Sequence, residues 1–300
     1  MKHLFNSEIN GLSSWEKMFQ SIDAWEPLIN HILKKEKLPV SKIENLKPGT
    51  NAVFKCGKYV VKIFTPDESG IISRVDFQSE IFALSYVSSL GVLVPKLITY
   101  GEVEDKYLFS YMITEYIDGI DFNEFSANLN NNEKIILAKR IREITDLFNR
   151  KCDRFNETDF IHDKNRHKRW DKYSENFKTE RLEYLNAHDF GENVFVHGDL
   201  CYDNIIINSN NSIHTIDFAD SGLAPLAYEH GHLASELFRF HKPFLEGYFG
   251  RYNTLDIADL CFNGLIIHDF GGDIVSENVA GVNEISCLDD LRNMIYKKLL

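Results

Sequence analysis

The stretch that decides the fold is Val196-His197-Gly198-Asp199-Leu200-Cys201-Tyr202-Asp203-Asn204, followed by Ile216-Asp217-Phe218. Apolar runs at 204–208 and 212–216 predict two short β-strands, and the Asn-Asn pair between them is a turn signal. A hairpin of this kind brings three polar side chains together at one end: Asp199, Asn204 and Asp217.

These three side chains suit phosphoryl transfer. One carboxylate can take or orient a hydroxyl proton, while an amide oxygen and a second carboxylate hold Mg²⁺ on a nucleotide. Taken alone, Asp199 and Asp217 are also ordinary turn formers. The spacing to Asn204 and the flanking strands therefore carry the functional interpretation.

The composition excludes several classes of protein. The 300 residues, 44% hydrophobic and 26% charged, are enough for one large domain or two modest lobes. No apolar run approaches the roughly 20 residues that cross a bilayer, and the N-terminus has no secretory pattern. The five cysteines are scattered, which argues against a disulfide scaffold or a zinc site. We expect a reduced, cytoplasmic protein that binds no membrane; the oligomeric state stays open.

The net charge of −12 argues against nucleic acid as a partner. The acidity is concentrated in residues 252–291, which contain no Lys or Arg. The acidic residues of this stretch are Asp256, Asp259, Asp269, Asp273, Glu277, Glu284, Asp289 and Asp290. Two interpretations are open: a solvated surface, or a pocket for a cationic small molecule.

The chain changes character along its length. Aromatic and aliphatic residues at helical spacing predict an N-terminal helical extension over 1–39. The order β-β-α-β-β predicts a small antiparallel sheet with one packed helix over 40–118, and residues 119–300 are mainly helical. The expected class is α+β.

Lys62 is a lone cation in the apolar strand Tyr59-Val60-Val61-Lys62-Ile63-Phe64. A buried lysine is costly unless it is paired or functional. Glu80, in the helix that follows, is its natural partner; the alternatives are that Lys62 extends to solvent and Glu80 is simply exposed.

With these motifs in order, the chain resembles the aminoglycoside phosphotransferase and choline kinase family. The resemblance covers roughly Leu46 to Phe240, and its strongest motif is His197-Gly198-Asp199-x-x-x-x-Asn204 with Ile216-Asp217-Phe218. It implies a bilobal protein-kinase-like fold. The sheet would form a nucleotide-binding N-lobe, and the helical C-lobe would carry the catalytic loop and the acceptor site.

The resemblance implies roles for single residues. Asp199 is the expected catalytic base, and Asn204 and Asp217 are the expected Mg²⁺ ligands. Lys62, held by Glu80, would bind the α- and β-phosphates of ATP. The backbone of Glu115 and Ile117 would bind the adenine edge, with Thr114 at the gate of the base pocket; GTP is not excluded.

The chain departs from the family pattern in three places. Pro48-Gly49-Thr50-Asn51-Ala52 has one glycine, so phosphate contacts would come from its backbone and from Thr50 or Asn51. Ala219 replaces the glycine after Asp217-Phe218. Glu229 replaces an aspartate that braces the catalytic loop, which leaves that bracing role open.

The expected function is ATP- and Mg²⁺-dependent transfer of the γ-phosphate to a hydroxyl of a small, cationic, aminoglycoside-like molecule. Asp269 and Asp273 are the candidate acceptor-binding residues. Two alternatives remain: a metabolic kinase of the same fold acting on choline, a sugar or an amino-alcohol, and an inactive nucleotide-binding regulatory module.

Overall fold

The computed structural model describes residues 3–47, 49–71 and 73–300. The chain divides into two compact units, Met1–Ser88 with Val94–Asp118, and Ser89–Leu93 with Gly119–Leu300. Each unit is described by itself. The expected α+β class with an antiparallel N-terminal sheet and a helical C-terminal part is confirmed.

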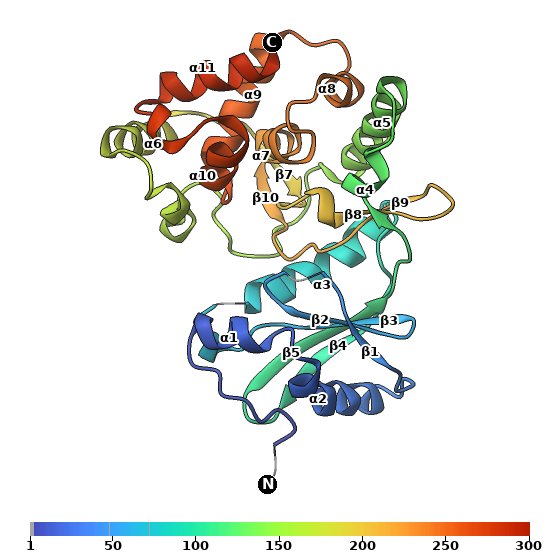
Figure 1. Cartoon of the computed structure of the whole chain (residues 1–300). Helices are drawn as coiled ribbons and strands as arrows, with labels where there is room; N and C mark the ends of the chain where they lie inside the picture. The colour runs from blue at the N-terminus through green and yellow to red at the C-terminus, as the bar shows by residue number, and fades with distance from the viewer. Residues whose placement is uncertain (1–2, 48, 72) are drawn as a thin grey trace. The chain divides into compact units, whose positions relative to one another are not determined.

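The first unit is built on a five-stranded antiparallel sheet of order β1-β2-β3-β5-β4. Helices α2 and α3 lie on opposite faces of this sheet (Figure 1). The elements of this unit are α1 (Leu12–Met18), α2 (Ile22–Lys35), β1 (Ile43–Asn45), β2 (Ala52–Cys56), β3 (Tyr59–Ile63), the 3₁₀ segment η1 (Asp67–Ser69), α3 (Arg74–Ser89), β4 (Leu97–Glu104) and β5 (Leu108–Glu115).

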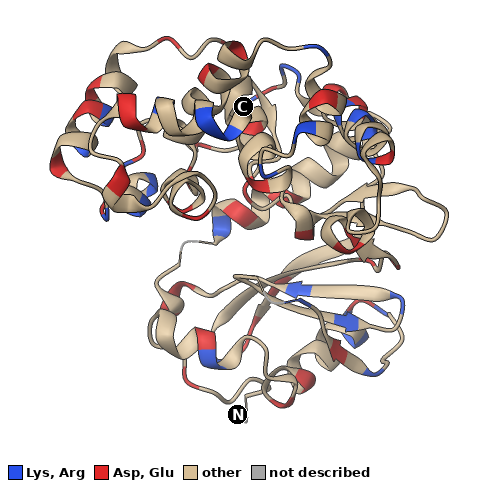
Figure 2. Cartoon of the chain, turned by 45° about the horizontal axis from the view of Figure 1, so that its top comes forward, with Lys and Arg blue, Asp and Glu red and all other residues tan. Residues whose placement is uncertain are grey.

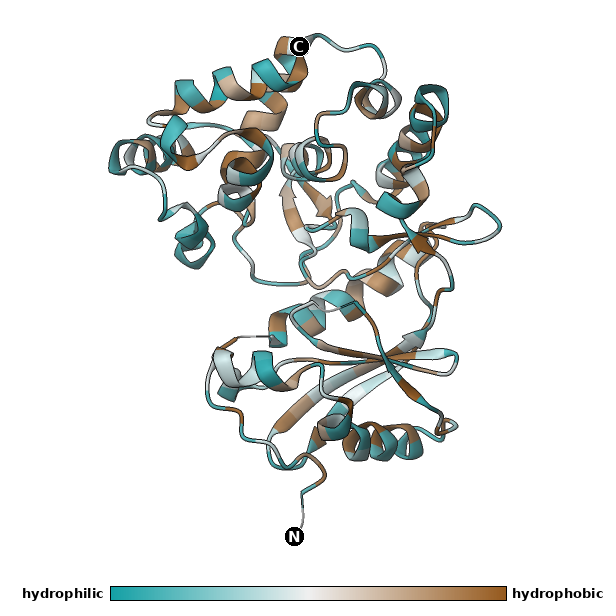
Figure 3. Ribbon diagram, in the orientation of Figure 1, coloured by the Kyte–Doolittle hydropathy of each residue, from teal (hydrophilic) through white to brown (hydrophobic). Residues whose placement is uncertain are grey.

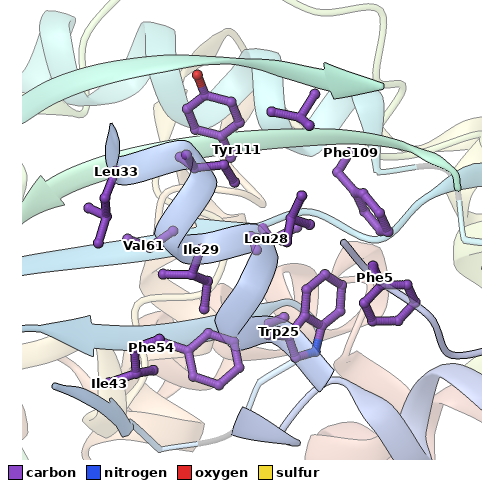
Figure 4. Close-up of a cluster of buried hydrophobic side chains, with 14 of the residues drawn as sticks. Phe5, Trp25, Leu28, Ile29, Leu33, Ile43, Phe54, Val61, Phe109 and Tyr111 are labelled. Atoms are coloured by element: carbon purple, nitrogen blue, oxygen red, sulfur yellow. The ribbon is translucent and has the colours of Figure 1, made fainter. Parts of the chain in front are cut away.

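The N-terminal helices share a hydrophobic core with the sheet rather than forming a separate extension. Trp25, Leu28 and Ile29 of α2 are fully buried, and they pack with Phe54 and Phe109 of the strands. Figure 4 shows α2 lying across the strands with these side chains interleaved. The sheet therefore carries helices on both faces, whereas the sequence pattern predicts one packed helix. The amphipathic pattern predicts the helices but not the surface that they cover.

The second unit is mainly helical and contains two small sheets. Its helices of at least seven residues are α5 (Asn131–Phe148), α6 (Glu175–Ala187), α7 (Leu226–His232), α8 (Lys242–Phe249), α9 (Thr254–Ile267), α11 (Leu288–Leu299) and the 3₁₀ segment η2 (Lys164–Trp170). Its shorter helical segments are α4 (Phe122–Ser126), η3 (Tyr202–Asn204), η4 (Leu233–Leu237), α10 (Gly271–Ile274), η5 (Val275–Val279) and η6 (Val282–Glu284).

Two small antiparallel sheets position the loop that follows β7 in this unit. Its strands are β6 (Ile120–Asp121), β7 (Asn193–Val196), β8 (Ile205–Ile207), β9 (Ile213–Thr215) and β10 (Gly222–Pro225). β7 pairs with β10, and β8 lies between β6 and β9. The β7–β10 pair is mostly hydrophobic in Figure 3, whereas α6 and α11 carry mixed colours. A buried strand pair thus anchors the loop that follows β7.

The described helices include none with both the length and the hydrophobicity needed to span a bilayer. All five cysteines are free thiols.

Candidate active site

The predicted hairpin is present and brings the expected polar residues together. β8 and β9 pair antiparallel, with Ile205 opposite Thr215. Just before β8, the Asn204 amide nitrogen donates to the Asp199 backbone oxygen at 2.7 Å and to Asp199 Oδ2 at 3.2 Å. After β9, the Ile216 N–H donates to the Asn204 carbonyl at 3.0 Å, so Asp217 follows directly at the same end of the hairpin.

The loop before Asp199 has a backbone that demands glycine. Gly198 has a φ of 87°, in the left-handed region. A Cβ at this position would collide with the Asp220 backbone carbonyl. His197, fully buried, contacts the Ile216 carbonyl through Nε2 at 3.0 Å and packs on the Phe218 ring. The loop is therefore tied to the segment that follows β9, and His197 braces it.

Glu229 of α7 braces the same loop, although its side chain is one methylene longer than the aspartate of the family pattern. The Gly198 N–H donates to Glu229 Oε2 at 3.2 Å. Burial raises the pKa of Glu229 to about 7, while the backbone N–H groups of Gly198 and His197 act in the opposite direction. The sequence leaves open whether a glutamate can replace the bracing aspartate, and this contact shows that the Glu229 side chain reaches the loop.

Negative charge accumulates around Asp199. Its pKa is raised well above the usual range, first by burial and then by the neighbouring carboxylates of Asp220, Asp217 and Glu236. A carboxylate in such surroundings binds a proton more tightly than one in water. The arrangement therefore favours proton acceptance at Asp199 and attracts a cation to the cluster.

Asp217 adopts an unusual backbone conformation. Its φ is 61°, in a region that residues other than glycine occupy rarely. Such strain persists only where the surroundings over-determine it, and it concentrates at functional sites. Here the paired hairpin before Asp217 and the buried Phe218 after it fix the carboxylate beside Asn204 and Asp199.

In the first unit, Lys62 and Glu80 form the expected pair. Lys62 Nζ lies 2.7 Å from Glu80 Oε2, and the two side chains are 6% and 2% exposed. β3 places Lys62 opposite Met112 of β5, and α3 supplies Glu80. A buried ion pair of this kind fixes the position of an ammonium group that would otherwise be too costly to bury.

The loop between β1 and β2 is anchored through Thr50 and Asn51. The Thr50 carbonyl accepts a hydrogen bond from Trp15 Nε1 at 2.8 Å, which ties the loop to α1. Asn51 is buried, and its Oδ1 accepts from the Thr65 N–H at 3.3 Å. The side chain of Asn51 thus already has an internal partner. Pro48, which belongs to the same predicted motif, lies outside the described residues.

The connector after β5 leaves one backbone donor open. The Glu115 N–H donates to the Lys96 carbonyl at 2.9 Å, and the Tyr116 N–H donates to the Lys58 carbonyl at 3.0 Å. Within residues 3–47, 49–71 and 73–300, the Ile117 N–H has no backbone acceptor. Thr114 is buried opposite Val60. The roles expected for the backbone of Glu115 and Ile117 at the edge of a purine base stay predictions.

Comparison with protein families identifies this architecture. The model of the phosphotransferase enzyme family APH matches residues 49–261, more than two thirds of the chain. This chain belongs to that family. It is a small-molecule phosphotransferase, as its motifs predict. A search of curated protein sequences gives no match.

Solved structures of similar fold agree with this membership. The streptomycin–ATP ternary complex of APH(2″)-IIa has a TM-score of 0.63 at 19% identity, covering 89% of this chain and 97% of that one. The ADP-bound aminoglycoside phosphotransferase APH(2″)-Ib gives 0.57 at 16%, covering 91% and 98%. The amicoumacin kinase hAmiN, in complex with AMP-PNP, Ca²⁺ and Ami, gives 0.54 at 17%, covering 90% and 93%. These likenesses establish the kinase-like fold of the phosphotransferase.

The acidic stretch of this phosphotransferase is partly neutralised by cations from elsewhere in the chain. Asp273 Oδ2 lies 2.6 Å from Arg169 Nη1, and Asp273 Oδ1 lies 2.6 Å from Lys172 Nζ. Asp259 pairs with Arg292 at 2.7 Å. Figure 2 shows acidic and basic residues interspersed over this unit. Asp273 therefore has two internal partners, and its role in acceptor binding stays a prediction.

Asp269 lies in a similar setting. Burial lowers the pKa of Arg166, but Tyr228, Asp269 and Asp220 raise it by more, so the net shift is upward. Arg166 Nη2 also donates to the Tyr228 hydroxyl at 2.8 Å. Asp269 thus lies near enough to Arg166 of η2 to raise its pKa, and the acceptor role expected for Asp269 also stays a prediction.

Three residues near Asp199 are not among those that the sequence motifs indicate: Asp220, Glu236 and His232. Asp220 and Glu236 raise the Asp199 pKa, and His232 Nε2 lies 3.7 Å from Asp199 Oδ1. Asp220 follows Asp217 by three residues, so proximity in sequence could have indicated it. His232 ends α7 and Glu236 lies in η4, where no local pattern distinguishes them from packing residues.

Proposed function

We propose that this phosphotransferase transfers the γ-phosphate of ATP, with Mg²⁺, to a hydroxyl group of a small cationic molecule of aminoglycoside type. The observation that carries the proposal is the meeting of Asp199, Asn204 and Asp217 at one end of the hairpin. In this proposal, Asp199 binds the acceptor hydroxyl and orients or accepts its proton. Phosphoryl transfer depends chiefly on positioning and charge stabilisation, which such a rigid cluster supplies.

The residues present fit a magnesium ion. Both hydrogen bonds of the Asn204 side chain use its amide nitrogen, so Oδ1 is the atom left to act as a ligand. Asp217 supplies a carboxylate, and hard oxygen donors are those that Mg²⁺ prefers. Burial and then the neighbouring carboxylates raise the Asp199 pKa, and the negative charge grouped there marks a place where a cation is favourable. When bound, the ion would neutralise charge on the nucleotide phosphates.

The first unit is assigned to the nucleotide. In this proposal, Lys62, held by Glu80, binds the α- and β-phosphates. The Glu115 carbonyl and the Ile117 N–H would hydrogen-bond the edge of the base, with Thr114 beside it. Thr50 and Asn51 would contact the phosphates mainly through the backbone of their loop. Proteins of similar fold have been solved with ATP, ADP and AMP-PNP, which supports a nucleotide here. A pocket gated by threonine also leaves GTP open.

The preference for a cationic acceptor rests on the carboxylates nearest Asp199. Burial raises the pKa of Glu236, and Glu277 and Asp203 add to the rise, while Asn278 and Arg239 oppose it. Glu236 also accepts a hydrogen bond from Asn278 at 2.6 Å, which joins η4 to η5. Carboxylates grouped beside a catalytic base attract amino groups. Asp220 and Glu236 are therefore stronger acceptor-site candidates than Asp273, which already pairs with two cations.

The proposal is tested with purified protein, Mg²⁺-ATP and a panel of acceptors. ADP release is measured with streptomycin, gentamicin, kanamycin, choline, ethanolamine and a neutral sugar. The expected result is acceptor-dependent release with the polycationic antibiotics, reduced about 10²–10⁴-fold in Asp199→Ala. Asp153→Ala, which removes an exposed aspartate of the same unit, is the matched control and should keep full activity.

Other outcomes separate the alternatives. Activity with choline, ethanolamine or the sugar alone would replace the antibiotic assignment with that of a metabolic kinase. Nucleotide binding without turnover on any acceptor, unchanged in Asp199→Ala, would indicate a regulatory module.

A further inference from the structure

A stack of three buried aromatic rings lies in the second unit behind the catalytic loop. The Tyr228 and His268 rings are 4.0 Å apart at 27°, and the His268 and His232 rings are 4.5 Å apart at 10°. Tyr228 is fully buried, and the two histidines are each 1% exposed. α7 supplies Tyr228 and His232, and His268 directly follows α9. The three rings are thus fixed by two packed helices.

The last ring of the stack faces Asp199. His232 Nε2 lies 3.7 Å from Asp199 Oδ1, while Asn204 donates to Oδ2 of the same carboxylate at 3.2 Å. The two oxygens therefore face two different side chains. A separation of 3.7 Å is longer than a hydrogen bond, but catalytic contacts often shorten when substrate binds. The Asp199 side chain keeps 29% of its surface exposed, so the acceptor hydroxyl can also reach it.

The stack keeps its imidazoles neutral. Burial, with a smaller effect from His197, lowers the pKa of His232 to about 3. The pKa of His268 is held well below its usual range by burial first, and then by His232 and Arg166. The Phe270 N–H donates to His268 Nδ1 at 3.1 Å, which fixes the ring as an acceptor at that nitrogen. His232 therefore meets Asp199 as a neutral group at physiological pH.

We propose that His232, held in place by the stacked rings of His268 and Tyr228, is a positioning residue that orients the Asp199 carboxylate through a neutral Nε2–H donor. The inference rests on the proposed role of Asp199 as the base. A neutral donor restrains the carboxylate without neutralising it. A cation in the same place would form an ion pair and weaken the base, and an apolar ring would leave Oδ1 unrestrained.

The first test does not depend on catalysis. Histidine labelled with ¹⁵N in the full chain is examined by NMR at neutral pH, with His232 assigned from the His232→Gln spectrum. We expect His232 as the neutral tautomer protonated on Nε2, with its Nε2–H signal displaced in Asp199→Ala. An Nδ1-protonated ring, or a signal unaffected by Asp199→Ala, would overturn the proposal whether or not the protein transfers phosphate.

The second test uses kinetics with the best acceptor of the panel. His232→Phe keeps a planar ring but removes the donor. It should lower kcat about 10–100-fold, the loss expected when a catalytic group is misplaced, with little change in the KM for ATP. His232→Gln places an amide N–H near the same position and should restore most of kcat. Equal activity of His232→Phe and wild type, or no recovery with glutamine, would contradict the positioning role.

His230 provides the matched control. It lies on the same helix, is 4% exposed, and packs on Tyr248 and Phe249 rather than on the catalytic loop. His230→Phe should change thermal stability as much as His232→Phe does while leaving kcat unchanged. An equal loss of kcat in both variants would show that the effect is general packing and would overturn the proposal.

Discussion

Replacing Glu229 with glutamine should remove a pH-dependent loss of stability. Glu229 is 1% exposed, and its Oε1 has no hydrogen-bond partner among the residues that the structure describes. Burial raises its pKa from 4.5 to about 7. Below pH 4.5 the carboxyl is protonated in both states. As the pH rises from 4.5 to 7 the unfolded chain loses this proton first, so the unfolded state is increasingly favoured.

The expected change in stability follows from the size of the pKa shift of Glu229. One pKa unit corresponds to about 1.36 kcal/mol, so a rise from 4.5 to about 7 costs the folded state about 3 kcal/mol above pH 7. About 2.5 kcal/mol of this cost develops between pH 5 and pH 8. Glutamine resembles the protonated acid and keeps an oxygen for the Gly198 N–H. The free energy of unfolding of Glu229→Gln, relative to wild type, should therefore rise by about 2.5 kcal/mol over that interval.

Urea unfolding followed by circular dichroism at pH 5, 6, 7 and 8 measures this difference. Glu143→Gln removes an exposed carboxylate from α5 of the same unit and should leave the pH profile of wild type unchanged. Parallel profiles for wild type and Glu229→Gln would refute the reasoning, because they would show that burial does not perturb this carboxyl group.

Three further outcomes follow from the structure. Gly198→Ala should lower the free energy of unfolding by about 1–3 kcal/mol in urea, because φ is 87° and the added Cβ collides with backbone. Lys62→Met should lower the free energy of unfolding by about 3–5 kcal/mol, because it leaves Glu80 buried without its ion-pair partner. The double variant Lys62→Met with Glu80→Gln should recover stability in urea but not ATP affinity in calorimetry. Recovery of both would count against Lys62 as a phosphate ligand. Asp273→Asn should change the free energy of unfolding by at most about 1 kcal/mol, because partly exposed ion pairs contribute little. It should also raise the KM for the acceptor less than Glu236→Gln does. A larger rise in KM with Asp273→Asn would restore Asp273 as the acceptor residue.

The parts of the site that sequence could predict are those with local signals. Strand periodicity and the turn between β8 and β9 define the hairpin, and its ends bring Asp199, Asn204 and Asp217 together. Lys62 was predictable because a cation on a buried strand requires a partner, and Glu80 is in the next helix. In both cases the chemistry of single residues limits the arrangements that a fold can adopt.

The parts that sequence could not predict depend on tertiary partners. The acidic stretch lacks Lys and Arg of its own, but Arg169, Lys172 and Arg292 approach it from other segments. His232 reaches Asp199 only because α7 packs against the strand before the catalytic loop. A helical pattern shows that the N-terminal helices have an apolar face but not that they bury it on the sheet. Charge and periodicity counted along the chain contain no information about these contacts.

The most direct test of the account is the identity of the product and its dependence on Asp199. Wild type and Asp199→Ala are each incubated with Mg²⁺-ATP and kanamycin, and the products are analysed by mass spectrometry. The account predicts an acceptor that gains one phosphoryl group on a hydroxyl, formed about 10²–10⁴-fold more slowly by Asp199→Ala. Equal product formation by the two proteins would contradict Asp199 as the base that directs phosphoryl transfer.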